Sequence, residues 1–427
     1  MHGISRRGFA LLGIVFLLPL AVAGSVRGEE AIYPDDEEIV RTLREIKPGE
    51  SLLLPPLAVH CGDLKMYGME KLGPGQRDYC NRMPYAPDRQ TALYAGGNHQ
   101  VPHRMNDVWE FHLGSNSWRL LYEPDGGNPG VHKGAYFLTS RTLVQNPEKE
   151  LTEQERESIE AYRVWWNENV VLENGHLATT RGGPIMPAHT SHAFCYAPRA
   201  KRRPWGPGAV AAAQLSTHAY FANKPIEAFA AQHDPNYSPM WMFDPFERRW
   251  SQYRTDGPRA ELRGMGATMT YLPDRGQSLY YVAAQNVSPA SYEMWLFDAV
   301  EDRWTELRPN GGKTIGELAG KEQIAPMSEQ QTAYSPKHKK LLAVDQHNTF
   351  VYDLEANTWA KIDTNTGIWG HDAHSVLAYD DRCDTFLLAF PPEGRGKAMK
   401  LAGFTFERGE WEILEPKGPP IPETKYG

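Results

Sequence analysis

Pairs of histidines are the residues of this sequence whose type and spacing most readily suggest chemistry. The pairs are His99 and His103, His189 and His192, and His371 and His374. Two or three imidazoles together with a carboxylate, such as that of Asp372, suit zinc, copper or iron. The second and third pairs therefore predict a metal site formed by His189, His192, His371 and His374. The cofactor is either a divalent transition metal held there or none.

Other polar and aromatic side chains are candidates for contact with a ligand. The candidates are His99, His103, Arg104, Arg181, Trp205, Trp369 and Asp372. Trp205 and Trp369 offer flat faces on which a sugar ring can stack, with packing in the core as the alternative. Asp372 beside His371 could act as an acid–base pair. None of these residues forms a recognised catalytic signature, so a role as solvated loop groups is the alternative for the polar ones.

A segment of two halves recurs five times and must position these side chains. The first half ends in a turn that begins with a tyrosine, as in Tyr85-Ala86-Pro87-Asp88-Arg89 and Tyr271-Leu272-Pro273-Asp274-Arg275. The other copies of this tyrosine are Tyr196, Tyr334 and Tyr379. In the second half an aromatic residue precedes a tryptophan by seven positions, and these tryptophans are Trp118, Trp250, Trp304, Trp359 and Trp411. Turn formers lie between apolar stretches, which predicts strands joined by tight turns.

The last four of these tryptophans are 54, 55 and 52 residues apart. The spacing and the motif resemble those of kelch repeats, in which one repeat forms one four-stranded blade. The resemblance implies an all-β protein with a kelch-type β-propeller over residues 79–420. Five blades are recognisable and six or seven are expected, with an insertion at about residues 125–187. It also implies that a histidine just before an inner strand, such as His192 or His374, can serve as a structural hydrogen-bonding group.

Two helices are predicted outside the repeats. Ile39, Leu43 and Ile46 share one face of a helix between about residues 35 and 47, which Pro48 and Gly49 end. Within the insertion, Thr152-Glu153-Gln154-Glu155 is a capping-box pattern followed by apolar residues at helical spacing.

The N-terminus predicts export. Ser5-Arg6-Arg7-Gly8-Phe9, followed by an uncharged apolar run to Ala23, resembles a twin-arginine signal over residues 1–28, with residues 29–78 as a helix and lead-in. The run is shorter than the roughly 20 residues that span a bilayer, although a retained anchor is the alternative. We therefore expect a periplasmic or extracellular protein with no membrane span once the signal is removed.

The net charge excludes some classes of partner, and the cysteines leave a disulfide possible. Removal of the signal leaves 42 basic and 53 acidic side chains, a formal charge of −11, which disfavours nucleic acid and anionic membranes as partners. Four cysteines occur without a CxxC spacing. Cys61 and Cys80 either form a disulfide or stay free, and Cys195 is predicted to be a small buried residue.

These features lead to two functional hypotheses. The first is a propeller that binds a glycan or a protein ligand through the loops that enter its innermost strands. The alternative is a carbohydrate-active enzyme, a hydrolase, lyase or epimerase, with a site in the same place that works either with a metal or without one. The sequence leaves open whether the chain is catalytic, and it leaves the oligomeric state open.

Overall fold

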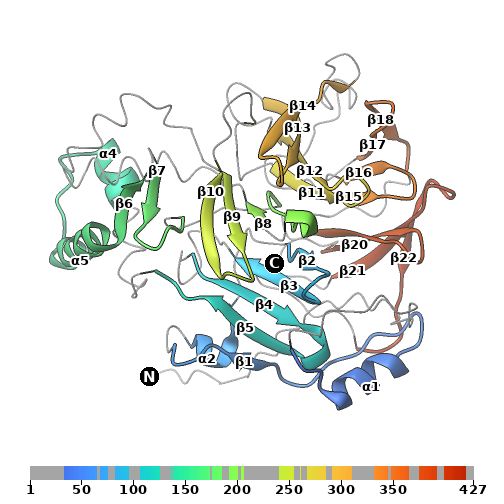
Figure 1. Ribbon diagram of the computed structural model, residues 1–427, viewed down its shortest axis with the longest axis horizontal. Helices are drawn as coiled ribbons and strands as arrows, with labels where there is room; N and C mark the ends of the chain where they lie inside the picture. Colours follow the sequence, from blue (N-terminus) through green and yellow to red (C-terminus); the bar gives the residue numbers. More distant parts are fainter. Residues whose placement is uncertain are drawn as a thin grey trace.

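The computed structural model is mostly β-structure, with few helices. It describes residues 33–64, 68–75, 82–95, 106–125, 135, 138–173, 176–184, 192–200, 203–205, 240–253, 260, 267–284, 291–309, 331–344, 348–364, 375–391 and 399–419. In this part of the chain, five larger sheets stand around a common centre in a propeller-like arrangement (Figure 1). Four of these sheets have four or five strands, and one has three.

Sheet 1 contains the first copy of the repeat. Its strands, in hydrogen-bonding order, are β1 (Ala58–His60), β5 (Ser117–Tyr122), β4 (Val108–His112), β3 (Thr91–Ala95) and β2 (Tyr85–Ala86). Strand β1 pairs parallel to β5, whereas the other pairs are antiparallel. The outer edge of the sheet is therefore covered by a segment that comes before the repeat.

Sheet 2 has three named strands, β8 (Arg203–Trp205), β9 (Met240–Asp244) and β10 (Arg249–Tyr253). The segment before β8 lies beside the first strand of the next sheet, because the backbone of His192 forms a parallel bridge with Thr268. The Met269 amide donates to the His192 carbonyl at 2.8 Å. The histidine predicted to precede an inner strand thus lies beside the neighbouring inner strand.

Sheets 3, 4 and 5 are antiparallel four-stranded sheets in simple sequence order. Sheet 3 consists of β11 (Ala267–Leu272), β12 (Gln277–Ala284), β13 (Ser291–Asp298) and β14 (Arg303–Glu306). Sheet 4 consists of β15 (Gln331–Ser335), β16 (Lys340–Val344), β17 (Thr349–Asp353) and β18 (Thr358–Ile362). Sheet 5 consists of β19 (Val376–Asp380), β20 (Thr385–Phe390), β21 (Lys400–Phe404) and β22 (Trp411–Leu414). The first strand of each is innermost, and β15 lies next to both β11 and β19.

The two ends of the propeller-like region are tied together by the lead-in segment. Glu50 forms a parallel bridge with Lys417, which follows β22, and the Ser51 amide donates to the Lys417 carbonyl at 2.8 Å. A few residues later the same segment becomes β1 on sheet 1. The segment from Glu50 to His60 therefore connects sheet 5 with sheet 1.

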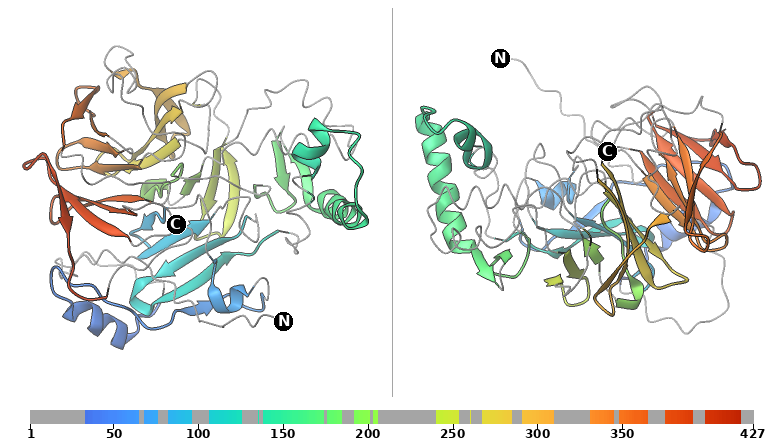
Figure 2. Two further views of the ribbon diagram at one scale, coloured as in Figure 1. Left: turned by 180° about the vertical axis from the view of Figure 1, so that it is seen from behind. Right: turned by 90° about the horizontal axis from the view of Figure 1, so that it is seen from above.

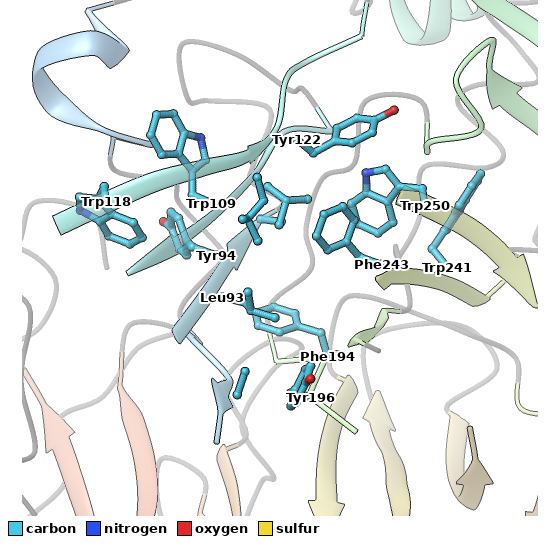
Figure 3. Packing of buried hydrophobic residues seen from close by; sticks show 14 of the residues in the cluster. Leu93, Tyr94, Trp109, Trp118, Tyr122, Phe194, Tyr196, Trp241, Phe243 and Trp250 are labelled. Atoms are coloured by element: carbon cyan, nitrogen blue, oxygen red, sulfur yellow. The ribbon is translucent and has the colours of Figure 1, made fainter. Parts of the chain in front are cut away.

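Three of the repeated tryptophans join a sheet to the one before it. Trp250 of sheet 2 donates its indole N–H to the Asn106 carbonyl at 3.1 Å, and Trp411 of sheet 5 donates to Thr349 Oγ1 at 3.0 Å. Trp359 of sheet 4 packs on the Tyr281 ring of sheet 3, with 5.3 Å between ring centroids. Figure 3 shows the contact of sheets 1 and 2, in which Trp250 and its neighbours lie beside Tyr122. The motif is thus explained by packing between sheets, because one sheet cannot bury both faces alone.

The repeated tyrosines make a second connection between sheets. The Tyr196 hydroxyl donates to Asp88 Oδ2 at 2.8 Å, and the Tyr334 hydroxyl donates to Asp274 Oδ2 at 3.0 Å. In each case the aspartate belongs to the turn of the preceding repeat. The aspartate in the Tyr-x-Pro-Asp-Arg motif is therefore an acceptor for the next tyrosine along the chain.

Replacement of Tyr334 by phenylalanine is expected to lower the free energy of unfolding by about 1 kcal/mol, because it removes this hydrogen bond and keeps the ring. Tyr85 occupies the same position of the first repeat but is 60% exposed, so Tyr85→Phe is the matched control with little expected effect. Urea unfolding of both variants measures the difference. Equal losses in the two variants would contradict this role of the tyrosine hydroxyl.

Both predicted helices are confirmed. Helix α1 (Glu37–Glu45) is capped by the Asp36 side chain and buries Ile39 and Leu43. Helix α5 (Glu153–Asn169) begins with the predicted capping box between Thr152 and Glu155. The shorter helical elements are α2 (Met69–Leu72), the 3₁₀ helices η1 (Leu113–Ser115) and η3 (Pro198–Ala200), the π-helix η2 (Leu138–Thr142) and α4 (Leu143–Gln145).

The insertion lies at the rim of the arrangement. Its helices are followed by a hairpin of β6 (Val170–Glu173) and β7 (His176–Thr179). Figures 1 and 2 place α4, α5 and this hairpin to the side of β9 and β10, away from the common centre. The described part of the insertion therefore lies at the edge of the arrangement.

The structure shows Cys61 and Cys195 as buried thiols. Cys61 is a buried free thiol, which agrees with the alternative to a Cys61–Cys80 disulfide, and Cys80 lies outside the described residues. Cys195 is buried as predicted and also has its Sγ atom 3.1 Å from Ser278 Oγ.

Among the described residues, no helix has the length and apolar character needed to cross a membrane.

Candidate functional site

Polar side chains from all five copies of the repeat lie at or just before the start of the inner strands. We call this set the central cluster, and it consists of Arg82, His192, Thr268, Gln331, Thr332 and Ser375. The inner strands bring them together because they run side by side in the same direction, as the parallel bridge between His192 and Thr268 shows. All members except Arg82 are buried, and Arg82 is partly exposed.

Arg82 reaches across the centre from sheet 1 to sheets 3 and 4. Its Nη1 donates to the Met269 carbonyl at 2.7 Å, and its Nη2 donates to the Thr332 carbonyl at 2.6 Å. No carboxylate of the described residues pairs with this guanidinium. Burial accordingly lowers the pKa of Arg82 from its usual value. Among the residues that the structure describes, this positive charge is therefore balanced only by carbonyl dipoles.

His192 also spans the centre. Its Nε2 lies 2.7 Å from the Gln331 amide nitrogen, and only 2% of the residue is exposed. This ring nitrogen already has a protein partner, which is the arrangement expected of a structural hydrogen-bonding histidine. In the part of the chain that the structure describes, no three histidine, cysteine, aspartate or glutamate side chains are placed to hold a metal ion.

Two hydroxyl groups of the central cluster have no hydrogen-bond partner among the described residues. They are Thr268 Oγ1 and Ser375 Oγ, and both residues are at least 98% buried. Thr270, two positions after Thr268 on the same strand, instead has its hydroxyl 2.8 Å from that of Thr332. A buried hydroxyl without a partner costs about 1–3 kcal/mol, so such groups are uncommon in folded proteins.

This contrast gives a matched pair of variants. Thr268→Val is expected to leave the free energy of unfolding unchanged or to raise it by up to about 1 kcal/mol, because it removes an unpartnered hydroxyl at constant shape. Thr270→Val is expected to lower it by about 1 kcal/mol, because it leaves the Thr332 hydroxyl without its partner. Thermal and urea unfolding measure both changes. A larger loss from Thr268→Val than from Thr270→Val would refute the assignment of the two hydroxyls.

Most of the site residues predicted from the sequence lie outside the described residues. These are His99, His103, Arg104, His189, Trp369, His371, Asp372 and His374. The metal site and the acid–base pair therefore stay predictions. Trp205 lies in strand β8, where its backbone is opposite Trp241 of β9, and so belongs to a sheet rather than to a loop. Among the predicted residues, His192 is the one that the structure places in the central cluster.

Arg181 lies at the base of the insertion, in a different cluster. Its Nη1 is 2.9 Å from the Oδ1 of Asp125, and its guanidinium lies 4.3 Å from the centre of the Tyr122 ring. Asp125 is buried and also accepts hydrogen bonds from Asn106 and from the Tyr122 hydroxyl, at 2.7 and 2.9 Å, and from Thr179. These contacts fasten the hairpin of β6 and β7 to sheet 1.

Sequence reasoning missed most of the central cluster, although a signal was present. Arg82, Thr268 and Gln331 each precede a repeated tyrosine by three positions, whereas His192 and Ser375 precede one by four. Aligned by that tyrosine, the five residues occupy nearly the same place in the five repeats. A polar residue three or four positions before each repeated tyrosine was therefore the signal in the sequence that indicated this cluster.

Neither a protein-family model nor a curated protein sequence matches this chain. Among solved structures, TolB from Acinetobacter baumannii matches with a TM-score of 0.36 and 10% sequence identity. The match covers 79% of this chain and 55% of the TolB chain, so this chain spans about half the length of that protein. The propeller-like arrangement described above therefore rests on the sheets of this chain alone.

Proposed function

We propose that the chain is an exported kelch-type propeller that binds a ligand at the centre of the ring, through the central cluster and the loops that lead into it. The five copies of the repeat support the kelch type, and the N-terminal resemblance to a twin-arginine signal supports a periplasmic or extracellular location. The ligand is a glycan, with a segment of another protein as the second candidate.

One observation carries this proposal. At the centre of the ring, Arg82 lacks a carboxylate partner and two buried hydroxyls lack any hydrogen-bond partner among the described residues. Groups left in this state cost stability, and polar groups that converge at one place without partners are typical of ligand sites. Because ligands contact propellers through the loops beside the innermost strands, the cluster lies where such a site is expected.

The second candidate function is a carbohydrate-active enzyme in the same place. Such an enzyme needs a general acid and a general base within reach of its substrate. The described part of the central cluster offers a histidine and an arginine but no carboxylate. The enzyme hypothesis therefore depends on His371 and Asp372, which precede the described Ser375 in the sequence.

The proposal is tested with signal-cleaved, untagged protein on arrays of glycans and peptides. We expect the wild type to bind a defined glycan, and the double variant Thr268→Val with Ser375→Ala to bind it about tenfold more weakly while remaining folded. The glycan that binds is then incubated with the protein, and its products are analysed by mass spectrometry. Metal content is measured on the same batch.

Three results would count against a binding protein with its site at the centre. They are the absence of any array ligand, full affinity in the double variant, and turnover of the bound glycan. Turnover that is abolished by His371→Ala or Asp372→Ala with affinity retained would establish the enzyme instead. The rim variant Arg181→Met is the control for affinity, because Arg181 is fastened to Asp125 away from the centre.

A further inference from the structure

The guanidinium of Arg82 is the most unusual charge in the described part of the molecule. Buried Arg89 has its carboxylate, Glu110, at 2.9 Å, and Arg181 has Asp125. Among the described residues, Arg82 has only two backbone carbonyls as partners. A cation that is partly removed from water and lacks an anion is costly, and a guanidinium has five N–H donors of which these two bonds use only part.

We propose that the centre of the ring binds a carboxylate, and that this carboxylate belongs to an acidic sugar. This inference rests on the proposed function and specifies its ligand. The two carbonyls fix the orientation of Arg82, so that its remaining N–H groups are held for a planar anion that accepts two parallel hydrogen bonds. Its partial exposure leaves it within reach of a ligand.

The neighbouring groups favour a sugar over an acidic peptide. Two hydroxyls lack partners among the described residues. Thr268 directly precedes Met269 on β11, and Ser375 precedes β19, which lies next to the β15 strand of Thr332. A sugar acid presents several hydroxyls next to its carboxylate and so complements both kinds of group at once. The carboxylate of an Asp or Glu side chain is attached to a methylene group, whereas a sugar acid has hydroxyls on the ring beside its carboxylate, so the sugar places more hydrogen-bonding groups close to Arg82. The chain as a whole is negatively charged and so repels anions. A local positive charge such as that of Arg82 is therefore needed to hold an acidic ligand.

The test compares matched oligosaccharides that end either in glucuronic acid, in its methyl ester or in glucose. With wild-type protein, titration calorimetry is expected to show binding of the acid that is about 10- to 100-fold tighter than binding of the ester or of glucose. This comparison changes only the ligand, so it does not depend on the folding of a variant. Arg82→Met is expected to remove the preference, and Arg82→Lys to keep part of it.

Arg303→Met is the matched control. Arg303 is exposed at the start of β14, at the end of sheet 3 opposite to the central cluster, and its loss should leave the preference unchanged. Equal affinity for acid and neutral sugars overturns the inference and leaves the proposed function standing. Binding of acidic peptides but of no glycan overturns the sugar assignment, and binding of no probe overturns the proposed function itself.

Discussion

Replacement of Glu110 by glutamine is expected to lower the free energy of unfolding by about 3–5 kcal/mol. Glu110 is fully buried on β4 and receives Arg89 Nε and Nη2, at 3.0 and 2.9 Å. Arg89 is itself only 4% exposed, so a neutral partner leaves a buried positive charge without its anion. Thr91 and Tyr33 also donate to Glu110, and burial together with this hydrogen bond raises the pKa of Tyr33 to about 12. The variant thus weakens four contacts at once.

Urea unfolding at neutral pH measures this loss as a lower midpoint at constant slope. The control is Glu412→Gln, which breaks the exposed pair with Arg408 and should cost less than about 0.5 kcal/mol. Exchange of the whole pair for apolar residues, Arg89→Met with Glu110→Leu, should recover much of the stability. If Glu110→Gln costs as little stability as the control, the buried pair of Arg89 and Glu110 does not stabilise sheet 1 as expected.

Replacement of Asp125 by alanine is expected to release the insertion from the ring. One buried carboxylate accepts from Asn106, Tyr122, Thr179 and Arg181, and its loss leaves several buried donors without an acceptor. At about 1–3 kcal/mol for a buried unsatisfied group, the expected loss is about 2–4 kcal/mol, concentrated locally. Hydrogen exchange should therefore quicken most in β6 and β7 and much less in sheets 3 to 5.

Arg181→Met is the matched comparison, since Arg181 is half exposed and contributes one contact of the four. It should cost about 1 kcal/mol or less and leave ligand affinity unchanged. Uniformly faster exchange over all sheets in Asp125→Ala would mean that the cluster stabilises the whole ring rather than the hairpin. Weaker ligand binding in Arg181→Met would return Arg181 to the ligand site predicted from the sequence.

The local elements of this protein were predictable because their signals are local. The capping box at Thr152 and the apolar stripe with Ile39 and Leu43 both indicate helices within a single turn or two, and both helices formed. Four of the five copies of the repeat each lie in one sheet, and the second half of the other copy forms β9 and β10, since turn residues and alternating apolar residues act between adjacent strands. The kelch type, the total number of blades and the export signal stay predictions.

The sequence by itself determined the strands, the tight turns and the helices, whose energies depend on neighbours a few residues away. Only the tertiary structure decided which side chains share the centre of the ring. Arg82 contacts carbonyls 187 and 250 residues away, and Asp125 meets Thr179 across 54 residues of insertion. Such contacts arise because closing the ring brings inner strands together irrespective of their separation along the chain. The types and spacing of residues do not show which distant residues lie close together in space. The histidine pairs were therefore noticed in the sequence, and the arginine at the centre was not.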